Sequence, residues 1–561
     1  MRMRHCLPVA VLVAACSRAP EGPPTLAKLP DIDAAAALAH IKKLSSDEFG
    51  GRSPGSKGEE MTVEYLTAQL KAAGLEPGNP DGTWIQKVPL VGLTSSEMTP
   101  LSIKKGDQTT TLAPHDDVIA FSQRVTDAIA LTDSEVVFAG YGVQAPEFQW
   151  DDFKGLDVVG KTLLVLINDP PVPDPKVAGG LDPAVFGGKA MTYYGRWTYK
   201  YEKAAELGAA AVFIIHETVP AAYPFSVVQG FGNERFDLVT PDKNMGLAAI
   251  EGWLSVEAAT RLLAAAGQDF QKLKAAAVTR EFKPIPLGVT ASMSFKQTSH
   301  PIESRNVIAR LTGSDAALKN EYVIYTAHWD HLGVGDERNG DKIYNGAADN
   351  ASGTAALLEI ARAMKKASPP PRRTILFMAV TAEEQGLLGS QYYAQFPLYP
   401  LDKTLADINA DNNLPMWGRT RDVTVVGYGA SDLEDVLGQA AAEQGRTVKP
   451  DAEPEKGSYY RSDHFNFAKS GVPSLAVDDG VDYVGKPAGF GKTRREEYLA
   501  NDYHSPSDEV KPDWDLSGFA EQAKLLFAVG YRVAQGAKYP AWRPGNEFKA
   551  IRDKALAASA K

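Results

Sequence analysis

The chain has 561 residues, of which 44% are hydrophobic and 23% are charged, a composition typical of a globular protein. The formal net charge is -11, and no basic or arginine-rich run offsets it, which argues against a nucleic-acid partner. The length exceeds that of one ordinary domain, so we expect two domains.

The N-terminus has the pattern of an export signal. Two arginines precede a short apolar run that ends at residue 15 and is too short to span a bilayer as a helix. The sequence VAAC at 13–16 resembles the lipobox of bacterial lipoproteins. We therefore expect removal of residues 1–15, a lipid on Cys16 and localisation in the bacterial cell envelope, periplasmic or anchored to the outer membrane. The alternative is an ordinary signal peptide cut a few residues later.

The expected tether and the first part of the catalytic domain follow this signal. Residues 16–30 are rich in proline and read as a tether, and Cys16 would be the one cysteine left, which excludes an internal disulfide. Within 31–95, apolar residues recur at helical spacing in 31–44 and 58–73, which predicts two helices joined by a glycine-rich loop.

Residues 96–290 differ in texture from the segments on either side of them. Short β-rich runs such as 134–139 and 162–167 are interrupted by prolines, and a helical stretch at 199–208 leads into an apolar strand at 209–215. We therefore expect a smaller, β-rich domain inserted into the catalytic domain.

Residues 291–561 are expected to form the main part of the catalytic domain. Apolar, β-branched runs predict strands, and amphipathic stretches between them predict helices. The alternation predicts an α/β fold with a mixed, mostly parallel sheet flanked by helices. The expected strands are 321–327, 374–380, 404–410, 423–427 and 474–477, and the expected helices are 352–366, 431–443 and 516–535.

Acidic and imidazole side chains follow three of these strands. In open α/β sheets, ligands bind outside the carboxyl ends of the strands. Such side chains come after the strands 321–327, 374–380 and 404–410, just before the helix 352–366, and in a late loop, YHSPSDE. We expect them to converge into one catalytic site. They are His328, Asp330, Asp349, Glu383, Glu384, Asp411 and His504.

These residue types are the ligands of zinc in hydrolytic enzymes. One tetrahedral ion with an open position cannot use five such ligands, whereas two zinc ions that share a carboxylate can. Three carboxylates and a bridging hydroxide also balance two dications, and without metal the carboxylates would repel one another. We assign Asp349 as the bridge, His328 and Asp411 to one ion, and Glu384 and His504 to the other.

The same motifs also show a family resemblance. In chain order, HxD, ADNASG, TAEEQGLLGS, INAD and YHSPSDE resemble the motifs of co-catalytic zinc aminopeptidases, the clan of bacterial leucyl aminopeptidase and glutamate carboxypeptidase. The segment SEVVFAGYGVQAPEFQWDDFKGLDVVGKTLLVL is similar to the protease-associated domain inserted in many of these peptidases. The resemblance covers most of the chain and implies the same five ligands and two zinc ions per chain.

The resemblance also implies roles for residues around the ligands. Glu383 would act as general base, taking a proton from water and giving it to the leaving amine. Asp330 would orient His328, and Tyr503 would hydrogen-bond the oxyanion of the tetrahedral intermediate. The choice of Glu384 over Glu383 as ligand depends on the family pattern more than on spacing. The substrate pocket would be lined by Ser462, Asp463 and His464.

Some residues near these motifs are explained without a metal. A single aspartate or histidine at a strand end is more often a cap or a surface group, so only the joint occurrence of the motifs favours a site. For Trp329 and His331 we expect no metal role, because a second histidine on the opposite strand face needs no metal. Asp463 alternatively caps the segment after Arg461.

Taken together, these patterns predict an exported, zinc-dependent exopeptidase, and an aminopeptidase that acts on peptides is favoured. A dipeptidase or carboxypeptidase of the same clan is the main alternative, and a single-zinc cyclase is a third. From another class, a metal-free receptor-like binding protein on the same scaffold would be marked by lost ligands. None of the five ligand positions is lost in this sequence.

Overall fold

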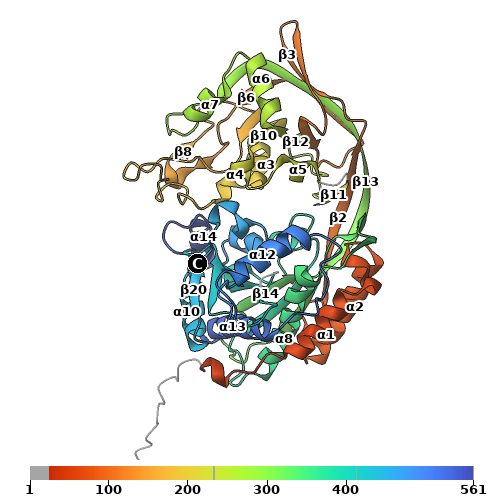
Figure 1. Ribbon diagram of the computed structural model, residues 1–561, viewed down its shortest axis with the longest axis vertical. Helices are drawn as coiled ribbons and strands as arrows, with labels where there is room; N and C mark the ends of the chain where they lie inside the picture. Colours follow the sequence, from red (N-terminus) through yellow and green to blue (C-terminus); the bar gives the residue numbers. More distant parts are fainter. Residues whose placement is uncertain (1–23, 231–233, 412–413, 560–561) are drawn as a thin grey trace, which may run out of the picture.

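A computed structural model describes residues 24–230, 234–411 and 414–559, which form two lobes joined by long strands (Figure 1). The expected export signal and Cys16 lie outside the described residues. Among the helices in the described ranges, none is long and apolar enough to cross a membrane.

The lower lobe in Figure 1 is built on a mixed sheet in which β14 is an interior strand. In spatial order its strands are β13 (Ile285–Leu311), β17 (Thr374–Val380), β14 (Tyr322–His328), β18 (Thr404–Asn409), β21 (Ser474–Asp479), β19 (Asp422–Val426) and β20 (Thr447–Pro450). The strands from β17 to β21 are parallel, and the antiparallel pairs are β13 with β17 and β19 with β21. The predicted mixed, mostly parallel α/β sheet is confirmed.

Helices cover both faces of this sheet. Because side chains alternate along a strand, Val323 and Tyr325 of β14 pack into one buried cluster, whereas Ile324 packs into another on the opposite face. Every residue of β14 and β17 is therefore buried. The first face is covered by α1 (Ala34–Leu44), α2 (Lys57–Ala72), α8 (Gly353–Lys366), α10 (Leu433–Glu443) and α13 (Ser517–Gln535), and the second by α9 (Leu388–Gln395) and α11 (His464–Lys469).

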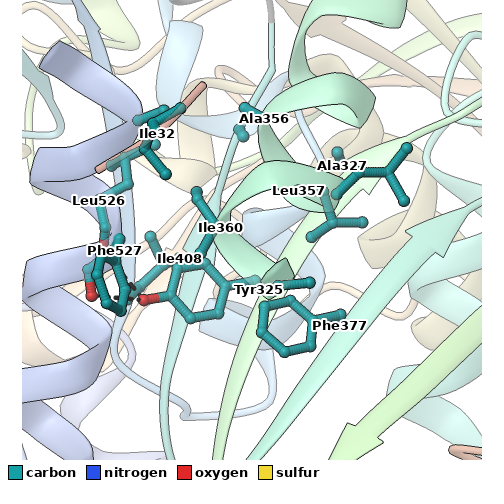
Figure 2. Packing of buried hydrophobic residues seen from close by; sticks show 14 of the residues in the cluster. Ile32, Tyr325, Ala327, Ala356, Leu357, Ile360, Phe377, Ile408, Leu526 and Phe527 are labelled. Atoms are coloured by element: carbon teal, nitrogen blue, oxygen red, sulfur yellow. Dashed lines mark hydrogen bonds between the residues drawn. The ribbon is translucent and has the colours of Figure 1, made fainter. Parts of the chain in front are cut away.

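Figure 2 shows the contact between β14 and α13 in the first of these clusters. The Tyr325 ring stacks on Phe377 of β17, with ring centroids 5.5 Å apart, and its hydroxyl donates to the carbonyls of Leu526 and Phe527 at 3.0 Å each. A buried tyrosine hydroxyl thus finds acceptors on the backbone of the helix. The contact fixes α13 against the strand whose end carries His328.

The upper lobe has its own sheet and its own buried clusters. Within it, β6, β9, β10 and β12 form a parallel series and β5 pairs antiparallel with β12. Helices pack on both sides of this sheet (Figure 1). The bounds are β5 (Val118–Phe121), β6 (Ala128–Phe138), β9 (Thr162–Leu166), β10 (Ala211–His216), β12 (Ile250–Ser255), α3 (Trp197–Glu206), α6 (Val256–Ala265) and α7 (Phe270–Ala276).

Two connections hold the lobes together. β13 is 27 residues long and pairs with β6 in the upper lobe and with β17 in the lower one, and β2 (Ile85–Ser96) runs antiparallel beside it. The expected boundary at 290/291 falls inside this continuous strand. At the other edge of the lobes, Tyr193 packs against Tyr460 and Phe465 of the lower lobe, with ring centroids 6.0 and 4.8 Å away. This second contact holds the upper lobe close to α11.

Candidate active site

The parallel strands of the lower lobe end at a common edge of the sheet. His328 is the last residue of β14, Asp411 follows β18, and Glu384 follows β17. Asp349 lies in the turn before α8, and His504 lies in the loop after α12 (Phe490–Asn501). The structure brings all five of these predicted residues together at this edge, as expected for the carboxyl ends of parallel strands.

The first half of the site is centred on His328, whose side chain is fully buried. Its Nε2 atom lies 3.2 Å from Oδ1 of Asp349 and 3.1 Å from Oδ1 of Asp411. On the other side of the ring, Nδ1 lies 3.1 Å from the backbone oxygen of Asp330 and 3.8 Å from its carboxylate. The backbone carbonyl, more than the predicted carboxylate, is therefore the partner that fixes this ring.

The second half of the site is centred on His504. Its Nε2 atom lies 3.0 Å from Oε2 of Glu384 and 3.4 Å from Oδ2 of Asp349. The two oxygens of Asp349 therefore face different histidines, Oδ1 towards His328 and Oδ2 towards His504. This is the arrangement of a carboxylate that is shared between two cations.

The donor set fits divalent metal ions. One nitrogen or oxygen from each of His328, Asp349 and Asp411 lies within 4.8 Å of the others. The same holds for His331, Asp349 and Glu384, and for His328, Glu383 and Glu384. The Nε2 atom of His504 is buried and makes no hydrogen bond, although carboxylate oxygens lie close to it. Imidazole nitrogens and carboxylate oxygens are ligands that zinc accepts.

The charges within the site also fit a place where cations bind. Burial alone would raise the pKa of Glu384, but the charges of His504 and His331, with the hydrogen bond to His331, together outweigh it and lower that pKa to about 2. Burial would lower the pKa of His504, yet the neighbouring carboxylates of Glu384 and Asp349 together raise it to about 10. For His328, the charges of Asp411 and Glu383 likewise overcome burial and raise its pKa well above the usual range. In the absence of a cation, both histidines are thus held in the charged form by the surrounding carboxylates.

Glu383 lies beside His328, but farther from it than the carboxylates of Asp349 and Asp411. Its Oε2 atom is 3.9 Å from Nε2 of His328, and 11% of its side chain is exposed. Burial raises its pKa well above that of an ordinary glutamate. The backbone N–H groups of Glu383 and Glu384 both donate to the Asp330 carboxylate, at 3.2 and 3.3 Å, so Asp330 sets the direction of this turn.

His331 is part of the site, which the sequence did not predict. Its Nδ1 atom lies 2.6 Å from Oε1 of Glu384, and its ring meets that of His504 edge to face at 5.9 Å. The expectation that His331 has no metal role stays a prediction, but the argument from the opposite strand face does not hold. β14 ends at His328, so the alternation of faces no longer applies to the residues that follow. The run HWDH, with a second histidine close to the first, was the available signal.

Asp508 and Arg52 hold the backbone around the ligands, and neither was predicted. The carboxylate of Asp508 accepts the N–H groups of Ala348 and Asp349, at 3.0 Å each. The buried Arg52 guanidinium donates to the carbonyl of Trp329 at 2.8 Å, and to the carbonyls of residues 345 and 346 at 2.6 and 2.9 Å. The bridging aspartate and the end of β14 are thus fixed by residues far away in the sequence.

The residues predicted to contact substrate fall into two groups. Tyr503 lies on the open side, with its ring stacked 3.9 Å from that of His504. Ser462 donates a short hydrogen bond to Asp411 and accepts one from the Asn409 side chain, so it supports a predicted ligand.

The expected pocket-lining role of Asp463 and His464 needs correction. Asp463 is fully buried and accepts a hydrogen bond of 2.6 Å from Ser390, and His464 is 1% exposed, with its ring against Tyr459. Burial raises the pKa of Asp463 to about 7 and lowers that of His464 to about 3. Both lie beneath the site because α11, which begins at His464, packs directly on the sheet.

Fold and site together place a cluster of possible metal ligands at the carboxyl edge of an α/β sheet. Residues 306–528 match the model of Peptidase family M28, in agreement with the resemblance that the motifs indicated.

Individual relatives match over parts of the chain. A "Probable zinc metalloprotease" of Pyrenophora teres f. teres is 43% identical over 95 residues, which are 17% of this chain and 19% of the relative. "Leupeptin-inactivating enzyme 1" of Streptomyces exfoliatus is 28% identical over 258 residues, 46% of this chain and 54% of the relative. The chain thus spans between about a fifth and about half of the length of these curated relatives.

Among solved structures, an aminopeptidase from Aneurinibacillus sp. strain AM-1 is 20% identical, with 92% of this chain and 95% of that chain covered at a TM-score of 0.46. The "zinc aminopeptidase from Bacillus subtilis" is 18% identical, with 93% and 98% covered at a TM-score of 0.42.

Proposed function

We propose that this protein is an exported, zinc-dependent exopeptidase, specifically an aminopeptidase that releases N-terminal residues from peptides. The observation that carries the proposal is the position of Asp349, whose two carboxylate oxygens lie 3.2 Å from His328 and 3.4 Å from His504. A shared carboxylate between two histidine-containing ligand sets is what a pair of zinc ions requires. The match of residues 306–528 to a peptidase family supports peptides as substrates.

The proposed ligand sets follow the two halves of the site. His328 and Asp411 would hold one zinc ion, His504 and Glu384 the other, and Asp349 both. When bound, the two ions polarise the scissile carbonyl and make water a better nucleophile near neutral pH. His331, bonded to Glu384, orients that carboxylate.

Glu383 is the group that would move the proton. It is available for this task because it forms no pair with either histidine as close as those of the proposed ligands. Its raised pKa suits a base that holds a proton between its transfer from water and its delivery to the leaving amine. Asp330 keeps Glu383 in position through the backbone N–H that it accepts.

Tyr503 is proposed to act at the site, and the N-terminus to anchor the protein. The Tyr503 ring lies against His504 at the open side of the site, where its hydroxyl could reach the oxyanion of a tetrahedral intermediate. The VAAC sequence supports a lipid on Cys16 and a place in the bacterial cell envelope. The inserted lobe, similar in sequence to protease-associated domains, would cover the substrate site.

Matched peptides test this function. The full-length mature protein, stripped with a chelator and reloaded with zinc, should hydrolyse peptides with a free N-terminus and leave their N-acetylated counterparts intact. Equal cleavage of both would favour the carboxypeptidase alternative. Conversion of peptides with an N-terminal glutamine to a cyclic product, without hydrolysis, would favour the cyclase. A folded protein that retains no zinc after reloading and cleaves no peptide would favour the receptor-like alternative.

A further inference from the structure

A cavity lies between the two lobes, apart from the candidate active site. Its volume is about 420 Å³, within the range of sites that hold small molecules. The upper lobe lines it with parts of 183–192, and the lower lobe with 427–430 after β19, with 457–460, and with 544–547 before α14 (Lys549–Ser559). Figure 1 shows α14 at the junction of the lobes. The five proposed zinc ligands, which are all described residues, do not line this cavity.

The charged side chains that line the cavity are acidic. Among the described lining residues they are Asp451 and Glu547. One oxygen of Glu547 accepts the Tyr460 hydroxyl at 2.8 Å, and the other accepts the backbone N–H of Tyr193 at 3.2 Å. Asp451 accepts the backbone N–H of Glu453 at 2.9 Å. Within residues 24–230, 234–411 and 414–559, neither carboxylate forms an ion pair. Each therefore keeps lone pairs for a further donor.

No cation balances this negative charge from within the cavity, since no basic residue is among the described residues that line it. Three basic side chains next to lining segments in the chain pair with other acids. They are Lys189 with Glu455 at 3.1 Å, Lys456 with Glu453 at 2.8 Å and Arg543 with Asp435 at 2.8 Å. Burial raises the pKa of Glu547 to about 7, and the charges of Asp169 and Glu147 act in the same direction. A bound cation would supply the missing positive charge.

The Tyr459 hydroxyl is an unused hydrogen-bonding group in the wall of this cavity. Tyr459 is 7% exposed, and its buried hydroxyl makes no hydrogen bond with any described residue. Its ring is held edge to face by Tyr460 and His464, with centroids 5.5 and 4.7 Å away, and a Cβ on Gly427 would lie 2.3 Å from it. Among charged groups, Glu547 contributes most to raising the pKa of Tyr459, after burial. A buried hydroxyl without a partner costs stability, which a ligand that bonds it would offset.

Aromatic rings form much of the remaining wall. Phe148 of the upper lobe and Tyr428, which is 56% exposed, line the cavity together with Tyr459 and Tyr460. Rings and carboxylates are the surroundings that organic cations prefer, because ring faces attract the charge and carboxylates accept the N–H groups. We propose that this cavity binds an organic cation through its primary ammonium or guanidinium group. Binding of such a cation does not depend on the proposed peptidase function.

The cation could come from a basic side chain of a peptide or from a free amine, and calorimetric titration of the zinc-loaded protein separates these sources. N-acetyl-lysinamide and N-acetyl-argininamide present the two basic side chains in peptide form. Their acetyl groups remove the free N-terminus that the proposed aminopeptidase requires. Pentylamine carries an ammonium group without a peptide unit. N-acetyl-norleucinamide, which has the apolar chain of lysine without the ammonium, is the neutral reference.

Tyr459→Phe is the sharpest variant. Because the hydroxyl makes no hydrogen bond in the cavity wall, its removal should not lower the unfolding temperature, yet cation binding should weaken by roughly 3- to 10-fold. Asp451→Asn keeps the size of the side chain and removes one charge, so binding should weaken by roughly tenfold or more. Tyr392→Phe is the matched control, since Tyr392 lies on α9 against Phe396, with ring centroids 5.0 Å apart, and does not line the cavity.

At least one cationic probe should bind the wild-type protein roughly 10- to 150-fold more tightly than N-acetyl-norleucinamide, the range of hydrogen bonds to charged groups. Tighter binding of a peptide-like cation than of pentylamine identifies a peptide side chain as the source, and equal or weaker binding identifies a free amine. Equal affinities for the charged and neutral probes would overturn the inference. Cation binding that both cavity variants leave unchanged would also overturn it. Because the readout is binding, a failure to hydrolyse peptides would overturn the proposed function alone.

Discussion

The role of Asp508 offers a sharp test of how the site is held together. Its carboxylate accepts the N–H groups of Ala348 and Asp349 at 3.0 Å each, and its own carbonyl accepts that of Ala347 at 2.9 Å. The substitution Asp508→Asn keeps the size of the side chain but replaces one acceptor oxygen with an amide donor. One of the two side-chain bonds is then lost, and two donors face each other.

The magnitude follows from these contacts. A hydrogen bond to a charged group contributes about 1.5 to 3 kcal/mol, and about 1.4 kcal/mol is a tenfold change in affinity. Part of this loss appears as displacement of Asp349, the proposed bridge, so zinc affinity should fall by about 10- to 100-fold, as is typical for partners of metal ligands. Because Asp508 is not a proposed ligand, the number of ions bound at saturating zinc should not change.

Competition with a chromophoric chelator measures this affinity. Asp482→Asn is the control, since Asp482 is an exposed carboxylate that pairs with Arg421 at 2.8 Å on the surface. Thermal unfolding of both metal-free variants reports any general loss of stability. If Asp508→Asn bound both ions within twofold of the wild-type affinity, the proposed backbone support of the bridge would be refuted.

Three further predictions concern the base, the upper lobe and the core. Glu383→Gln should lower kcat by about 10²- to 10⁴-fold with zinc content unchanged, and a loss below tenfold would assign the base elsewhere. Burial raises the pKa of Glu251 in the folded protein from 4.5 to about 8. The folded protein therefore loses stability as the pH rises from 4.5 to about 8, because the unfolded chain ionises this carboxyl more readily. At about 1.4 kcal/mol per pH unit, Glu251→Gln should add up to about 5 kcal/mol to the free energy of unfolding at pH 9 and almost none at pH 5. The unfolding temperature of both proteins measures this effect, and an equal change at the two pH values would contradict the prediction. A Cβ on Gly530 would lie 2.1 Å from the Tyr325 hydroxyl, so Gly530→Ala should destabilise the protein by about 1 to 3 kcal/mol, and chemical denaturation with an unchanged midpoint would argue against the contact.

Much of the lower lobe follows from local sequence patterns. A strand buried on both faces is apolar throughout, so the expected strand at 374–380 and β17 (Thr374–Val380) share their bounds. Parallel strands end at one edge of a sheet, so the residues that follow them lie together. This rule alone groups His328, Asp411 and Glu384. Asp349 and His504 joined them through the charge argument and the family motifs.

The remaining features depend on contacts between distant segments. Asp508 supports Asp349 across 159 residues, and no periodicity or spacing links the two. Asp463 was misjudged because burial of a polar residue at the start of a short helix depends on the sheet beneath it, which the local sequence does not describe.

The continuous 27-residue strand β13 was also beyond reach from sequence. Its register with β2 and β6 fixes it as one strand, whereas its sequence alternates between polar and apolar residues in some parts and is apolar in others. Pairing with different partners along its length explains that change of pattern, because each partner leaves different faces buried.

The number of zinc ions bound per folded chain tests the central claim most directly. Elemental analysis of the zinc-reconstituted, dialysed protein should find about two ions per wild-type chain, and fewer than one in Asp349→Ala with the fold retained, since that residue is assigned to both ions. A wild-type chain that holds a single ion, or one that folds and binds none, would contradict the account of a carboxylate shared between two metals.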